Sequence, residues 1–144
     1  MLTTLEKVDR LQRAVLFQGV PTESLARVAA IAQEVSWDTR QFLFLEDDPP
    51  DAMFFLLEGQ VELLRSGQEA HKVGPHHVVG ALALLADEPQ PESAMADQPS
   101  RALRIDQQDF YEALGEDFNI TRGILRALVH VAGRGEQNPP PPRS

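Results

Sequence analysis

The sequence predicts a mainly β domain with flanking helices (α+β), folded as an antiparallel β-roll or jelly roll of about seven to eight short strands. From about residue 35 to 105, short β-rich runs alternate with turn residues. Helical periodicity lies only before and after this region, apart from one embedded helical turn or two. The runs follow one another too closely for the crossover helices of a parallel sheet, so an antiparallel roll or sandwich is expected.

Two helices are expected before the strands. Over the first twenty residues, Thr3 and Glu6 form a capping-box pattern and Gly19 suits a helix end. The apolar positions of this helix recur at spacings of three and four: Leu5, Val8, Leu11 and Val15. A second helix begins near Pro21 and Glu23. Its apolar face comprises Leu25, Val28, Ala29, Ala32 and Val35.

The expected strands are EVSW, FLFLE, MFFLLEG, QVELLR, EAHKVG, SAMAD and RALRID. Turn-forming segments separate them: DDPPD, SGQ, GPHH and DEPQP. The segment ALALLAD interrupts the strands with a short helix.

Two further helices are expected after the strands. Asp106 can cap a short helix that ends at Gly115 and carries Phe110 and Leu114. The final helix presents Ile120, Ile124, Ala127, Leu128 and Val131 on one side. We expect residues 1–134 to form one domain, and the Pro-rich residues 135–144 to be a disordered tail or a linker.

Composition narrows the class of protein. The chain is 42% hydrophobic and 24% charged, with no cysteine and no secretory signal, so we expect a cytoplasmic domain, or the cytosolic domain of a larger membrane-associated protein, without direct membrane insertion. The net charge is -9, and residues 18–118 contain 19 acids against six Lys and Arg. Such a surface would repel nucleic acid, which we therefore do not expect as a partner.

Four segments resemble the cyclic nucleotide-binding domain family: LFQGVPTESLARVAAIAQEV, DDPPDAMFFLLEGQVEL, VGPHHVVGALALL and RALRIDQQDFYEAL. The family includes catabolite activator proteins, regulatory subunits of cyclic-AMP-dependent kinase and cytosolic domains of gated channels. The resemblance covers nearly the whole chain, and FFLLEGQVEL is its most specific segment. It implies a β-roll with a short phosphate-binding cassette helix.

The cassette departs from the family pattern at the residues that bind the ligand. The family usually has Phe-Gly-Glu and later Pro-Arg-Ser-Ala, where Glu accepts from the ribose hydroxyl and Arg pairs with the cyclic phosphate. This resemblance places Ala81 at the Glu and Glu92 at the Arg. The candidate ligand pocket therefore comprises Val79, Gly80, Ala81, Leu82, Pro91, Glu92, Ser93 and Ala94.

The replacement of Arg by Glu92 predicts loss of phosphate binding. Two unit charges about 4 Å apart interact by roughly 4 kcal/mol at an effective dielectric near 20, so reversing one changes attraction into repulsion. No Lys or Arg lies between Lys72 and Arg101 to compensate. No cofactor is expected; a cyclic nucleotide bound through backbone amides and roll loops is an alternative.

The family also has glycines in the turns that precede the FF strand and the cassette. A Glu-Gly-Asp-x-Gly-Asp pattern is replaced by Glu46–Asp51 without glycine, and a Gly-Asp turn by His76 and His77. The core pattern is kept, whereas the ligand pattern is lost.

The residues themselves suggest other candidate sites. The amides that follow Gly80 could hold an anion, although a structural turn is favoured. Val79, Ala81 and Glu92 could line a pocket for a cationic or neutral molecule, although a filled cavity is commoner. His71, His76 and His77 lack a metal-binding spacing, so no metal is expected. Nucleophile-elbow and phosphate-loop motifs are missing, so no enzyme is expected.

The final helix carries a basic stripe at spacings of four: Arg122, Arg126, His130 and Arg134. It could contact a partner or another domain of a larger protein, form a homodimer, or remain a solvated face. Our hypothesis is a non-enzymatic regulatory or interaction module with a disabled nucleotide site. The alternatives are a sensor of a different small ligand and a conventional cyclic-nucleotide receptor.

Overall fold

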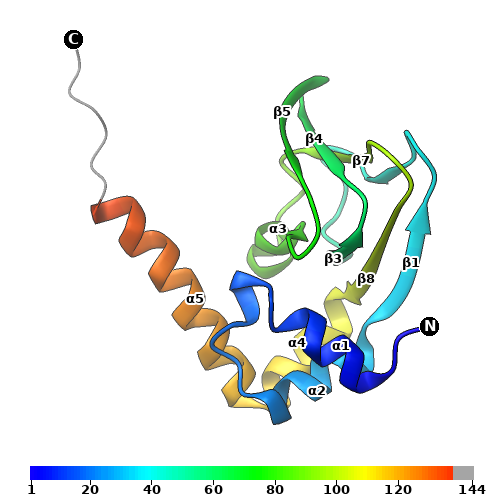
Figure 1. The fold of residues 1–144 in the computed structure, drawn as a ribbon. Coiled ribbons are helices and arrows are strands. Elements are labelled where there is room, and N and C mark those ends of the chain that lie inside the picture. Colours follow the sequence, from blue (N-terminus) through cyan, green and yellow to red (C-terminus); the bar gives the residue numbers. More distant parts are fainter. Residues whose placement is uncertain (138–144) are drawn as a thin grey trace.

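The computed structural model describes residues 1–137, in which two four-stranded antiparallel sheets form a roll above a group of helices (Figure 1). The first sheet has the order β1 (Gln33–Trp37), β8 (Ser100–Asp106), β3 (Ala52–Glu58) and β6 (Val78–Val79). The second has the order β2 (Phe42–Phe44), β7 (Ser93–Ala96), β4 (Val61–Arg65) and β5 (Gln68–Val73). The fold class expected from the sequence is confirmed.

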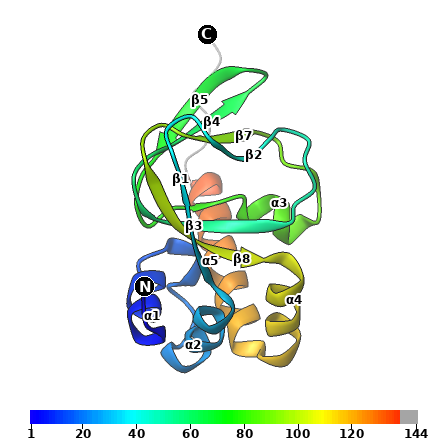
Figure 2. The ribbon, with the colours of Figure 1, turned by 90° about the vertical axis from the view of Figure 1, so that its right-hand side faces the viewer.

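The helices are α1 (Thr4–Leu11), the 3-10 turn η1 (Val15–Phe17), α2 (Thr22–Ile31), α3 (Ala81–Ala86), α4 (Gln107–Glu116) and α5 (Phe118–Gln137). Figure 2 shows α1, α2 and α4 below the roll, with α3 inserted among the strands. The helix α5 continues three residues into the segment expected to be a tail, and the rest of that segment lies outside the described residues. Along the described part of the chain, none of the helices has the length and apolar character needed to cross a membrane.

Strand β3 is buried on both of its faces and separates two cores. Its alternation directs Met53, Phe55 and Leu57 into a core shared with the helices. The intervening residues Phe54 and Leu56 face the interior of the roll. The roll and the helical layer therefore share strand β3, and β8 joins them in the same way, with Ala102 in the roll core and Leu103 and Ile105 in the helical core.

The expected N-terminal helix was correct at its start and wrong at its end. The Thr3 hydroxyl accepts from the Glu6 amide at 3.2 Å, and the Glu6 carboxylate accepts from the Thr3 amide at 3.0 Å, which completes the capping box. However, α1 ends at Leu11 and is followed by η1, which leaves Leu5 82% and Val15 53% exposed. The chain reversal buries Phe17 instead, whose ring packs edge-on against Phe110.

The other helix boundaries agree closely with the expectation. Four of the five residues on the expected apolar face of the second helix are buried, whereas Val35 belongs to strand β1. The Asp106 carboxylate caps α4 by accepting from the amides of Gln108 and Asp109. Gly115 lies inside α4, which ends one residue later.

Ion pairs fasten the outer strands. Glu34 accepts from the Leu2 amide at 2.6 Å and from the Arg101 guanidinium at 2.6 Å. The Leu2 hydrogen bond first, and Arg101 after it, lower the pKa of Glu34 below its usual value. Asp97, which follows β7, raises the pKa of Lys72 on β5 through a 3.3 Å contact. Charged contacts thus help to hold the N-terminus and one edge strand of each sheet, β1 and β5, in place.

Helix α5 packs on η1 through two glycines. A Cβ on Gly123 would lie 2.7 Å from the Gly19 carbonyl oxygen and 2.7 Å from Cγ2 of Val20, distances that ordinary carbon contacts do not reach. The close approach of the two backbones therefore requires glycine at position 123.

Replacing Gly123→Ala is expected to lower the free energy of unfolding by about 1–3 kcal/mol, because α5 must move away from η1. The matched control is Gly115→Ala on α4, where an added Cβ meets nothing within 4 Å. That change is expected to be neutral or stabilising by up to about 1 kcal/mol. Urea unfolding of both variants measures this difference, and equal stabilities would contradict the packing described.

Candidate functional site

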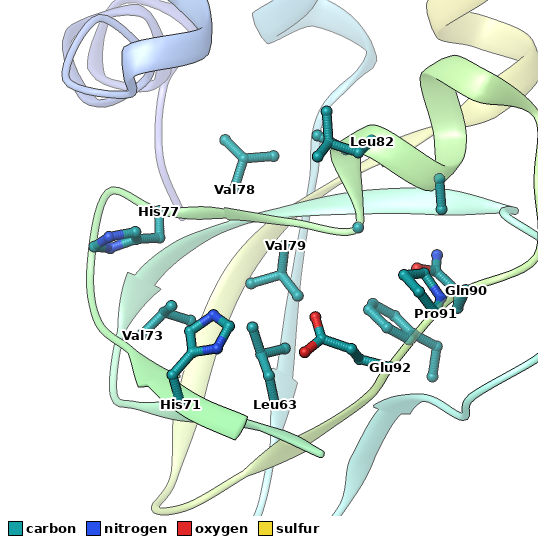
Figure 3. A pocket seen from close by; sticks show the side chains of 14 residues that line it. Leu63, His71, Val73, His77, Val78, Val79, Leu82, Gln90, Pro91 and Glu92 are labelled. Atoms are coloured by element: carbon teal, nitrogen blue, oxygen red, sulfur yellow. The ribbon is translucent and has the colours of Figure 1, made fainter. Parts of the chain in front are cut away.

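A cavity of about 280 Å³ opens between the roll and helix α3 (Figure 3). Six of the eight residues expected to form the pocket line it: Val79, Gly80, Ala81, Leu82, Pro91 and Glu92. Sequence reasoning missed the other lining residues: Phe44, Leu63, His71, Val73, His77, Val78, Ala83 and Gln90. The first four come from strands remote in the sequence, whereas the last four adjoin the predicted residues along the chain. Most of the walls are apolar.

Ser93 and Ala94 are absent from the lining. The Ser93 hydroxyl accepts from the Glu46 amide at 2.7 Å. Ala94 is fully buried and is paired with Phe44 on one side and Leu63 on the other. These two residues hold strand β7 in place, and they do not face the cavity.

Pairing between β6 and β3 positions the start of the cassette. Val79 lies opposite Phe54 in the sheet, and the chain then turns at Gly80 with φ +85°. A Cβ at Gly80 would lie 3.2 Å from the Phe44 ring and 3.3 Å from the Gln90 amide nitrogen. Both the left-handed backbone and the crowding favour glycine here.

Helix α4 holds the other end of α3. The Tyr111 hydroxyl donates to the Leu84 carbonyl at 2.6 Å. The Gln107 amide donates to the same carbonyl at 3.2 Å and to the Asp87 carboxylate at 3.0 Å. The cassette is therefore anchored to the helical layer even though its ligand residues have changed.

The Glu92 carboxylate points toward the middle of the cavity in Figure 3, near Val79 and Leu63. Its side chain is only 18% exposed. Among the lining residues, Glu92 is the only one of type Asp, Glu, Lys or Arg. The cavity therefore presents an anion at the position that the family resemblance assigns to a cation.

The expectation that no cation lies near Glu92 was wrong. The register of β4 against β7 pairs Leu64 with Ser93, so the next residue of β4, Arg65, comes beside Glu92. The nearest guanidinium nitrogen is 3.8 Å from the carboxylate, and the Arg65 side chain is 65% exposed. Such an exposed pair contributes at most about 1 kcal/mol, and Arg65 itself does not line the cavity.

The three histidines considered as metal ligands, His71, His76 and His77, lie in two different environments. His71 lies on strand β5 and His77 precedes β6, and both line the cavity (Figure 3). His76 turns away and packs against the Phe55 ring, with centroids 6.1 Å apart. Among the side chains that the structure describes, no group of three or more His, Asp or Glu could hold a metal ion.

Two turns keep a left-handed backbone without glycine. Asp47 has φ +72° and His76 has φ +77°, and these are positions where the family pattern has glycine. Each costs about 1–2 kcal/mol relative to a relaxed residue, somewhat less for Asp. Both turns therefore have the backbone conformation that glycine adopts most readily, although neither residue is glycine.

The predicted interaction helix is exposed. Arg122, Arg126 and His130 all face solvent on α5, and the side chain of Arg134 lies outside the description. Three of the four exposed large apolar side chains described on α5 lie beside these basic residues, Phe118, Leu125 and Val129, which are 68%, 53% and 68% exposed; the fourth is Val131 at 55%. The stripe is therefore mixed, with basic and apolar residues side by side.

Residues 34–117 match the family model described as cyclic nucleotide-binding domain. The chain is 25% identical over 133 residues to a CRP-like cAMP-activated global transcriptional regulator of Mycobacterium tuberculosis, an alignment that covers 89% of this chain. It is 26% identical over 113 residues, 76% of its length, to a cAMP-dependent protein kinase regulatory subunit of Yarrowia lipolytica. The chain therefore belongs to the cyclic nucleotide-binding domain family.

The N-terminal domain of a transcriptional regulator from Streptomyces coelicolor A3(2) has a similar structure, with a TM-score of 0.81 and 27% identity. That likeness covers 93% of this chain and 99% of the other. By contrast, the alignments span only 59% of the mycobacterial regulator and 30% of the kinase subunit. The relatives named here are regulatory proteins, and this chain corresponds to one part of each longer one.

The anchoring of α3 predicts the effect of Tyr111→Phe. Because the Leu84 carbonyl then keeps only its longer hydrogen bonds, from the Gln107 side chain and the Asp87 backbone amide, we expect the free energy of unfolding to fall by about 0.5–1.5 kcal/mol. Hydrogen exchange at the Leu84 and Asp87 amides should accelerate more than exchange in β8. Uniform acceleration across both regions would show that Tyr111 does not hold the cassette.

Proposed function

We propose that this chain is a non-enzymatic regulatory module whose cavity does not bind cyclic nucleotides in the usual way of its family. One observation carries the proposal: the Glu92 carboxylate is directed into the cavity where the family has the phosphate-binding arginine. An anionic phosphate at about 4 Å from that carboxylate would be repelled by roughly 4 kcal/mol at an effective dielectric near 20.

Two further features support the proposal. Ala81 supplies no acceptor for a ribose hydroxyl at the position where the family has Glu. Arg65 is the nearest cation to Glu92, but it lies outside the lining and Glu92 stands on the cavity side of the pair. A phosphate in the cavity would therefore meet the carboxylate without facing the guanidinium.

The proposal predicts no cyclic AMP or cyclic GMP binding at micromolar concentrations, because that affinity requires about 8 kcal/mol of binding free energy. Isothermal titration calorimetry measures the affinity for each nucleotide. The double variant Ala81→Glu with Glu92→Arg restores the family residues and should gain affinity, since α3 and its anchors are kept. As a control, Ala81→Glu with Glu88→Arg changes the net charge by the same amount but puts the arginine at an exposed position outside the lining, and should gain none. Micromolar binding by the wild-type chain would refute the proposal.

The open cavity supports a second candidate function, a sensor of a ligand other than a cyclic nucleotide. Its walls are largely apolar, and its volume of about 280 Å³ suits a small molecule. Such a sensor would use the same fold, since α3 and α4 would still connect the cavity to the helical layer.

We also propose that α5 is the interaction surface of the module, through which two copies pair or a neighbouring domain docks. Its exposed apolar residues Phe118, Leu125 and Val129 lie at spacings of seven and four, which suits a helix-to-helix contact. The basic residues beside them complement the acidic surface of residues 18–118. Nucleic acid remains an unexpected partner for so acidic a domain.

Sedimentation analysis tests the pairing of two copies. The wild-type chain should show a concentration-dependent dimer, and Leu125→Asp with Val129→Asp should abolish it. Arg122→Glu with Arg126→Glu should weaken it in a salt-dependent way. Leu5→Asp is the control, because Leu5 is 82% exposed on α1, away from this surface. A wild-type chain that stays monomeric at all concentrations would rule out the dimer.

A further inference from the structure

The cavity has a distinctive combination of one carboxylate and apolar walls. Glu92 points inward near Leu63 and Val79 in Figure 3, and Val73 and Phe44 also line the cavity. A carboxylate in an apolar wall favours a positively charged or hydrogen-bond-donating group on the ligand. An aromatic face adds attraction for a cation.

No hydrogen bond within the described residues engages the Glu92 carboxylate, and its one ion pair is weak. The Arg65 guanidinium is 3.8 Å away, outside hydrogen-bonding distance, and mostly exposed to solvent. A ligand cation inside the cavity would lie in a less hydrated environment than Arg65 does. Replacing the exposed Arg65 by a ligand cation inside the cavity, as the partner of Glu92, therefore costs little free energy.

The surrounding charge favours the same class of ligand. The net charge of the chain is -9, and the segment from residue 73 to residue 100 contains four acids and no Lys or Arg. Such a field raises the local concentration of cations and lowers that of anions.

We propose that the cavity takes a small organic cation, whose ammonium, amidinium or guanidinium group pairs with Glu92 while its apolar part lies against Leu63 and Val79. This inference rests on the proposed function, because it assigns a ligand class to the cavity that the phosphate has lost. His71 and His77 also line the cavity, where their ring nitrogens add hydrogen-bonding capacity.

Three probes of nearly equal shape test the charge preference: benzamidine is a cation, benzamide is neutral and benzoate is an anion. The wild-type chain is isotope-labelled and titrated with each at about pH 8, above the usual titration range of imidazole. Benzamidine should give saturable amide shifts at Val79, Gly80 and Glu92, with at least tenfold higher affinity than benzamide. Benzoate should give none. Equal affinities for the three probes, or no saturable shift with benzamidine, would overturn the inference.

Glu92→Gln keeps the shape of the side chain and removes its charge. It should lower the affinity for benzamidine at least tenfold and leave that for benzamide unchanged. The matched control is Glu88→Gln, an exposed carboxylate of the same loop that does not line the cavity, and it should bind benzamidine as the wild type does. Equal benzamidine affinities for Glu92→Gln and Glu88→Gln would also overturn the inference.

A cyclic AMP titration in the same samples separates the two proposals. Micromolar binding of cyclic AMP would refute the proposed function. If neither cyclic AMP nor benzamidine binds, only the assignment of a cationic ligand fails, and the disabled nucleotide site stands.

Discussion

The double burial of β3 is the constraint on which the rest of the structure depends. Six consecutive residues, Ala52–Leu57, are buried because alternate side chains enter two different cores. The same strand pairs with β8 over most of its length and with the short β6. Since β6 leads directly into Gly80, the position of the cassette follows from the packing of a strand that does not line the cavity. The cassette can therefore keep its shape while its ligand residues change.

The features predicted from sequence are those encoded by local patterns. Thr3 with Glu6, and Asp106 at the start of α4, were correct because capping depends on residues three apart or fewer. Seven strands were found from runs between turn residues, whereas β6 was missed because two residues carry no period. The assignment of Val15 to the first helix was wrong, because a periodic pattern does not show where the chain reverses direction.

Long-range register explains what the sequence could not show at the site. The contact of Arg65 with Glu92 requires the alignment of β4 with β7, and no spacing in the sequence encodes it. For the same reason, the sequence placed His71 in the expected strand EAHKVG but did not show that it lines the cavity from β5. Conversely, the inward direction of Glu92 agrees with the family pattern, because the turn before β7 is fixed by Ser93 and Glu46.

The central claim is that an inward carboxylate at position 92 excludes a cyclic phosphate from an otherwise intact cavity. The most direct measurement is the amide spectrum of the isotope-labelled chain during addition of cyclic AMP, observed at Gly80, Ala81 and Glu92. The account predicts that these resonances do not move in a saturable way at micromolar to low millimolar concentrations. A saturable shift confined to these residues would show that the phosphate enters despite Glu92, and would contradict the account.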